Sequence, residues 1–133
     1  MDASFADRCT EVAVTYGFSG SPHIDKQNCG PFYGLALGTF RGGGIRVECS
    51  ARVVAEVDTR NKIARVDGRY PHWVAPYDGD NNDGDDGDGS GDVVGSAERF
   101  SLIYYETGGK FAEPGPAIFS IPSESANNKL GAN

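Results

Sequence analysis

The chain has 133 residues, of which 38% are apolar, and its formal charge is −7. This length is sufficient for one modest hydrophobic core. It is too short for a catalytic domain joined to a separate recognition domain, and no apolar run approaches the roughly 20 residues of a membrane-spanning helix. Nineteen glycines and seven prolines favour many short strands and turns over long helices.

Strand-like runs recur along the chain, after at most one turn of helix before residue 11. Residues 11–18 alternate apolar with small or polar side chains, which predicts a half-buried strand; the apolar set is Val12, Val14, Tyr16 and Phe18. The other expected strands lie at residues 33–40, 45–49, 52–57, 62–66, 70–77, 99–105 and 116–121. A loop is expected at 106–116 and a frayed tail at 122–133.

Tight turns connect several of these strands. The run Arg41-Gly42-Gly43-Gly44 separates strands 33–40 and 45–49, and therefore predicts a hairpin. Seven or eight short strands joined in this way predict an all-β fold, an antiparallel sandwich or barrel with at most short helices.

The negative charge is concentrated in one segment. Residues 78–92 hold seven aspartates and five glycines without Lys or Arg, and the remaining 12 acidic and 12 basic residues balance. Because this segment has nothing apolar to bury, we expect a flexible insertion in a single domain spanning 1–133. Its motif Asp86-x-Asp88-x-Ser90-Gly91 is similar to the start of a calcium loop, but Ala97 stands where such loops have a bidentate glutamate.

The N-terminal sequence MDASFADRCTEV is too polar for a signal peptide. Cys9, Cys29 and Cys49 are odd in number and lack CxxC spacing, which favours reduced thiols over disulfides or a zinc site. We therefore expect an intracellular protein, cytoplasmic or nuclear, without a membrane segment.

His23 and Asp25 are separated by one residue, and the chain has one other histidine, His72. On an extended segment, residues i and i+2 project from the same face, so an imidazole and a carboxylate can converge on one point. Two histidines and one carboxylate on one octahedral face suit non-haem Fe(II) that activates dioxygen. Taken alone, the three residues also fit a structural interpretation, in which His23 is a loop histidine, Asp25 is a turn aspartate and His72 is a core histidine.

Arg99 and Ser101 open the strand-like run RFSLIYY and should lie on one face of it. A buried guanidinium is unfavourable without a partner, and its fork matches a carboxylate in bidentate geometry. Ser101 can donate a further hydrogen bond to the same ligand. The alternative is an edge-strand arginine whose head stays in water.

The order HxD, GGGIRVE, distal His and RFSLIYY resembles the Fe(II)/2-oxoglutarate-dependent dioxygenases over residues 11–105. The segments HIDKQNCGPFYGLALGTFRGGGI and DGRYPHWVAPY are most similar to the branch that contains the TET and J-binding-protein base oxidisers. The resemblance implies a double-stranded β-helix, or jelly-roll. It also implies iron ligands at His23, Asp25 and His72, and a 2-oxoglutarate site at Arg99 assisted by Ser101.

The resemblance has one departure in spacing. Twenty-six residues separate the distal histidine from the arginine, where such enzymes have a short turn. Removing residues 78–92 would restore the ordinary spacing, so the acidic segment is interpreted as an insertion into that turn, which a scaffold tolerates at low entropic cost.

The implied activity is that of an oxidoreductase that uses Fe(II), 2-oxoglutarate and dioxygen to hydroxylate or oxidise a substrate, with release of succinate and CO2. The substrate can be a nucleobase, a protein side chain or a metabolite, because the fold and the cofactor do not determine which of these is oxidised. No basic stripe supports nucleic acid as a partner. The alternative function is a jelly-roll binding module without turnover, calcium-responsive through the Asp-rich loop. A cupin is disfavoured because its HxH-plus-Glu pattern is missing.

Overall fold

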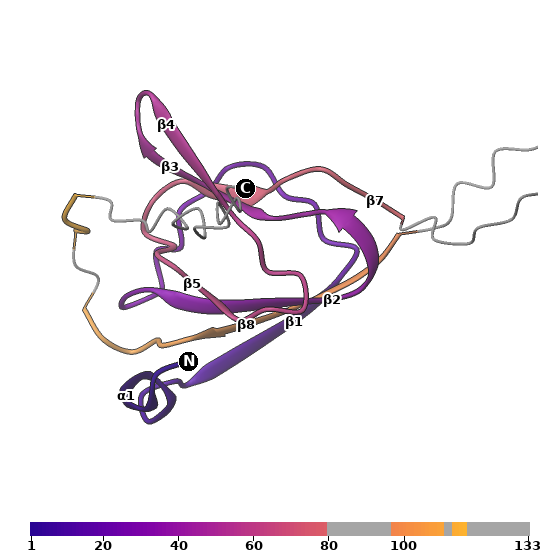
Figure 1. The fold of residues 1–133 in the computed structure, drawn as a ribbon. Coiled ribbons are helices and arrows are strands. Elements are labelled where there is room, and N and C mark those ends of the chain that lie inside the picture. The colour runs from indigo at the N-terminus through magenta and orange to yellow at the C-terminus, as the bar shows by residue number, and fades with distance from the viewer. Residues whose placement is uncertain (80–96, 111–112, 117–133) are drawn as a thin grey trace, which may run out of the picture.

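The computed structural model of the chain describes residues 1–79, 97–110 and 113–116 (Figure 1). These residues are mainly β, which confirms the expected class, and one short helix precedes the first strand. In chain order the elements are α1 (Ala3–Ala6), β1 (Glu11–Tyr16), β2 (Phe32–Gly42), β3 (Ile45–Ser50), β4 (Val53–Val57), β5 (Ala64–Val66), β6 (His72–Val74), β7 (Tyr77–Gly79) and β8 (Glu98–Tyr105). No helix among the described residues is long and apolar enough to cross a membrane.

The strands form two antiparallel sheets. The larger has the order β1-β8-β2-β5, with β7 paired to the end of β2, and the smaller has the order β4-β3-β6. An isolated bridge between His23 and His72 adds one more pairing beside β6. In Figure 1, β1, β8 and β2 run together along one side, while β3 and β4 lie on the other.

The pairings are nested along the chain. β3 pairs with β4 at the centre of the sequence, β2 pairs with β5 outside them, His23 pairs with β6 next, and β1 pairs with β8 outermost. Each pair in this series belongs to the sheet opposite to that of its predecessor. The chain therefore behaves as one long hairpin folded across two layers.

The expected hairpin between residues 33–40 and 45–49 is wrong. β2 and β3 belong to different sheets, and the glycines between them carry the chain from one layer to the other. Gly42 and Gly43 have φ of 79° and 70°, a backbone conformation that side chains other than glycine rarely adopt. A hairpin within one sheet and a connection between two sheets both have a glycine-rich turn between two strands. The local sequence therefore did not distinguish a hairpin from a crossing between sheets.

The expected strand at 70–77 is interrupted. Ala75 and Pro76 separate β6 from β7, and a proline cannot donate a ladder hydrogen bond. Asp78 and Gly79 belong to β7 and pair with β2, so the acidic segment starts later than expected. Residues 80–92 and 117–121, which include the remainder of that segment and most of the expected last strand, lie outside the described residues.

The apolar face of β1 points outward. Val12, Val14 and Tyr16 are 52%, 65% and 61% exposed, whereas Ala13 and Thr15 line a cavity between the sheets. The alternation therefore identified the strand, but its apolar face is not the one that lies inside. The core proper is a cluster of buried residues between the two sheets: Phe32, Ile45, Val47 and Val66.

Candidate metal centre

Backbone pairing holds the HxD segment against β6. The His23 N–H donates to the His72 carbonyl over 3.1 Å, and the His72 N–H donates to the His23 carbonyl over 2.9 Å. Two residues later, the Asp25 N–H donates to the Gly68 carbonyl over 2.8 Å. These bonds fix the residues of the HxD motif beside the distal histidine, although His23 and His72 are far apart in sequence.

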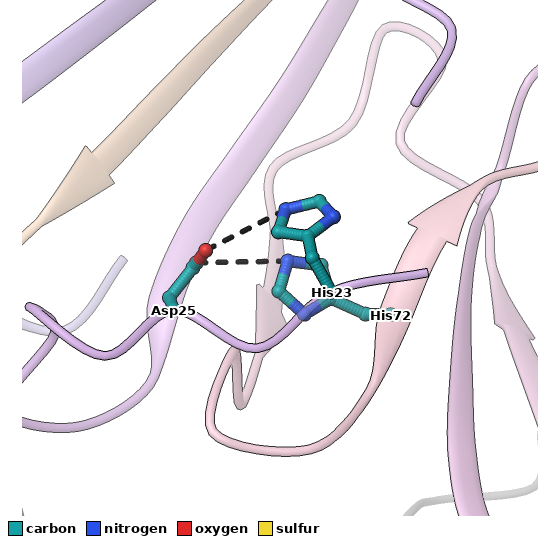
Figure 2. Close-up of side chains that lie close together, drawn as sticks. All are labelled: His23, Asp25 and His72. Atoms are coloured by element: carbon teal, nitrogen blue, oxygen red, sulfur yellow. Dashed lines mark ion pairs between the residues drawn. The ribbon is translucent and has the colours of Figure 1, made fainter. Parts of the chain in front are cut away.

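The structure brings together the three side chains expected to bind metal (Figure 2). His23 Nε2 lies 3.6 Å from Asp25 Oδ1, and His72 Nε2 lies 3.5 Å from Asp25 Oδ2. One ligand atom of each residue lies within 4.8 Å of the other two. Both contacts are longer than the roughly 2.7–3.2 Å of an N–H···O hydrogen bond, so neither ring bonds the carboxylate directly.

Each imidazole is oriented through its other nitrogen. His23 Nδ1 lies 2.9 Å from the Ser21 carbonyl oxygen, and His72 Nδ1 lies 3.0 Å from the Tyr70 carbonyl oxygen. A carbonyl oxygen can only accept, so the hydrogen of each neutral ring belongs on Nδ1 and the Nε2 lone pair faces Asp25. Backbone carbonyls commonly orient metal-binding histidines in this way. Two nitrogen lone pairs then face a carboxylate, which is unfavourable unless a cation, either a proton or a metal ion, lies between them.

The donor set fits a divalent metal. Imidazole and carboxylate ligands lie about 2.1 Å from such an ion, so neighbours on one octahedral face are about 3 Å apart. Each observed carboxylate–imidazole distance would have to shorten by roughly half an ångström, and the widest separation in the set, up to 4.8 Å, by more, through rotation of the side chains. One carboxylate and two imidazoles leave the other face of the octahedron for exogenous ligands, the arrangement typical of non-haem iron.

Two further residues fix the carboxylate of Asp25. Asn28 Nδ2 donates to Asp25 Oδ2 over 3.0 Å, and the Asn28 side chain is buried. Gly68 lies on another side, where a Cβ would be 2.6 Å from Oδ2. Glycine is required at this position because the carboxylate approaches the backbone so closely.

The Arg99 side chain is 1% exposed, which excludes the solvent-exposed edge-strand alternative. Its Nη1 donates to Ser101 Oγ over 2.5 Å and its Nη2 donates to the Gly43 carbonyl over 2.8 Å, while Nε has no partner. The guanidinium lies 5.4 Å from the Phe40 ring centroid and 5.3 Å from that of Tyr77. Burial lowers the pKa of Arg99, but an arginine side chain is not deprotonated in proteins, so the group remains a cation.

No carboxylate of the described residues pairs with Arg99. Cation–π contacts with two rings offset part of the lost hydration, but they leave the positive charge uncompensated. A buried guanidinium in this state favours an anionic ligand, and its planar fork suits a carboxylate.

A single cavity of about 510 Å³ connects the two groups. It is lined by all three candidate metal ligands and by both Arg99 and Ser101. Its other walls are largely apolar and include Phe32, Ile45 and Ile103. The cavity can therefore hold one molecule that reaches both the metal donors and the guanidinium.

No protein-family model, curated protein or solved structure matches this chain. The site therefore rests on the geometry of the described residues. The residues of the calcium motif, Asp86 to Gly91, lie outside them.

Sequence reasoning missed four residues of this site. Asn28, Gly68 and Gly43 act through contacts with residues distant along the chain, and Thr15 lines the cavity from β1. A local signal existed for Thr15 alone, because it lies on the small or polar face of the alternating run 11–18.

Proposed function

We propose that the chain is an Fe(II)- and 2-oxoglutarate-dependent dioxygenase with a jelly-roll fold. The observation that carries the proposal is that one cavity contains both a two-histidine, one-carboxylate donor set and a buried arginine without an anionic partner. A metal site alone would fit many proteins. A second, cationic site in the same cavity favours a ligand that chelates the metal at one end and carries a carboxylate at the other.

The strand pairing supports the fold part of the proposal. A jelly-roll consists of two antiparallel sheets that a long folded hairpin builds by alternating between layers. The nested pairs β3–β4, β2–β5, His23–β6 and β1–β8 alternate in this way. The distal histidine and the arginine then come from the two last strands of the series, β6 and β8, one in each sheet.

Within this proposal, His23, Asp25 and His72 hold Fe(II) on one face and leave the other open. When bound, the metal would supply the redox chemistry that couples decarboxylation of 2-oxoglutarate by dioxygen to oxidation of a substrate C–H bond. Arg99 and Ser101 bind the distal carboxylate of 2-oxoglutarate and thereby orient its 2-oxo acid end toward the metal donors. The apolar cavity walls restrict the access of water to the reacting groups.

The proposal is tested first by binding, because the substrate is unidentified. Titration of 2-oxoglutarate into protein loaded with redox-inert Mn(II) should show binding that is much tighter than to metal-free protein. The variant Asp25→Ala should lose this difference, and Asp7→Ala, which removes an exposed carboxylate outside the cavity, should keep it.

Turnover is then measured as succinate released with Fe(II) and dioxygen in the presence of pooled nucleic acids, peptides and metabolites. Equal 2-oxoglutarate affinity with and without metal would contradict the proposal. So would succinate release that is unchanged in Asp25→Ala.

A further inference from the structure

Two buried side-chain atoms of the described residues have no hydrogen-bond partner, and both belong to residues that line the same cavity. They are Thr15 Oγ1 and Arg99 Nε. Burying a polar atom without a partner is unfavourable, and native proteins contain few such atoms. Two of them in one cavity indicate a ligand that satisfies both.

Strand register places Thr15 next to the Arg99 subsite. Thr15 on β1 is the antiparallel partner of Ser101 on β8, so the two side chains lie on the same face of the sheet at adjacent positions. On the other side of Ser101, the partner is Ala36 of β2, which has no side-chain donor. Across β1, β8 and β2, the side chains at this level are therefore Thr15, Ser101 and Ala36. The two hydroxyl groups are neighbours, and the small methyl group of Ala36 leaves space beside them.

The hydrogen-bond directions leave these hydroxyls free to donate. Ser101 Oγ accepts from Arg99 Nη1, so its own hydrogen remains available. Thr15 Oγ1 makes no bond at all among the described residues. Two O–H donors and the unpaired Nε–H of the guanidinium belong to residues that line one cavity, and a carboxylate, with four lone-pair sites, can accept from all three.

We propose that Thr15 completes a carboxylate subsite with Arg99 and Ser101 by donating its hydroxyl hydrogen to the distal carboxylate of 2-oxoglutarate. This inference rests on the proposed function for the identity of the ligand. The donor cluster itself requires only that the ligand carry a terminal carboxylate.

The test compares three variants. Thr15→Val removes the hydroxyl and keeps the shape, Thr15→Ser keeps the hydroxyl, and Thr39→Val makes the same change at an exposed position of β2 outside the cavity. Three ligands are titrated: 2-oxoglutarate with Mn(II), 2-oxopentanoate with Mn(II), and glutarate without metal. 2-Oxopentanoate keeps the chelating end but lacks the distal carboxylate, and glutarate keeps the carboxylate but lacks the 2-oxo group.

Thr15→Val should weaken 2-oxoglutarate and glutarate binding about 10- to 100-fold, the range expected for a lost hydrogen bond to a charged group. Its affinity for 2-oxopentanoate should be unchanged. Thr15→Ser and Thr39→Val should bind all three ligands nearly as the parent protein does. The melting temperature of unliganded Thr15→Val should be equal or higher, because the variant no longer buries an unpaired hydroxyl.

The outcomes separate this inference from the function on which it rests. Unaltered 2-oxoglutarate affinity in Thr15→Val would overturn the role of Thr15 and leave the dioxygenase proposal intact. If the parent protein binds glutarate but shows no metal-dependent binding of 2-oxoglutarate, and Thr15→Val weakens the glutarate complex, the subsite stands and the dioxygenase proposal fails. A lowered melting temperature with equal losses for all three ligands, or no dicarboxylate binding by the parent protein, would overturn the subsite.

Discussion

The substitution Gly68→Ala isolates the geometry of the candidate metal centre without changing any of its donors. A Cβ at this position would lie 2.6 Å from Asp25 Oδ2, whereas ordinary contacts start at 3.4 Å. The same Cβ would also lie 3.0 Å from the Phe32 ring, which is 2% exposed, so the carboxylate has to move by about 0.8 Å to restore an ordinary contact. Metal–ligand distances tolerate only about 0.2 Å of deviation.

We expect Gly68→Ala to weaken Mn(II) binding about 10- to 100-fold, the usual effect of disturbing the groups that orient metal ligands. Overpacking should also lower the free energy of unfolding of the metal-free protein by about 1–3 kcal/mol. Isothermal titration calorimetry and chemical denaturation measure the two effects. The matched control is Gly30→Ala, in the segment that follows Asp25, where no atom lies within 4 Å of the added Cβ.

Gly30→Ala should leave both quantities within error of the parent protein. If Gly68→Ala binds Mn(II) as tightly as Gly30→Ala does, then Asp25 is not held in a metal-binding position. The assignment of this carboxylate as a ligand would then be wrong.

Three further predictions follow from the site and the chain. His72→Ala should lower Mn(II) affinity by at least about 100-fold in the same titration, because it removes one of three ligands. Arg99→Met should weaken 2-oxoglutarate binding by about 2–5 kcal/mol, the range for truncating one side of a buried charge pair. Its unliganded melting temperature should not fall, since an uncompensated buried charge is lost, and Arg46→Met on the exposed side of β3 is the control. Replacing residues 80–92 by a short turn should keep the melting temperature within a few degrees, because the segment has no apolar side chain and both β7 and β8 remain.

The β class of the chain was predictable because it depends on local features. Short alternating runs separated by glycines determine where strands begin and end, and most expected strands recur in the structure within a few residues. That β2 and β3 belong to different sheets was not predictable in this way. Gly42 and Gly43 permit a hairpin and a crossing between sheets equally, and the choice depends on β5, β7 and β8, which compete for the edges of β2.

Alternation in β1 identified two faces but not the one that points inward. The usual assumption is that the apolar face packs on the core, which would have buried Val12 and Val14. Here the inner face of β1 borders a cavity that is also lined by the Arg99 guanidinium and the Ser101 hydroxyl, so small and polar side chains occupy the inner positions. The failure of the rule at Ala13 and Thr15 is itself a sign of a binding site, since functional sites are where local patterns and the fold disagree.

The candidate ligands and the residues that position them differ in how visible they are in a sequence. His23, Asp25 and His72 could be singled out because the chain has two histidines, and the HxD spacing puts two of the ligands on one face. Gly68 has no such signal, because its role exists only once the carboxylate of residue 25 lies against it. A motif states which atoms carry the chemistry. The small residues that leave those atoms room are defined by contacts between distant segments, and they have to be read from the structure.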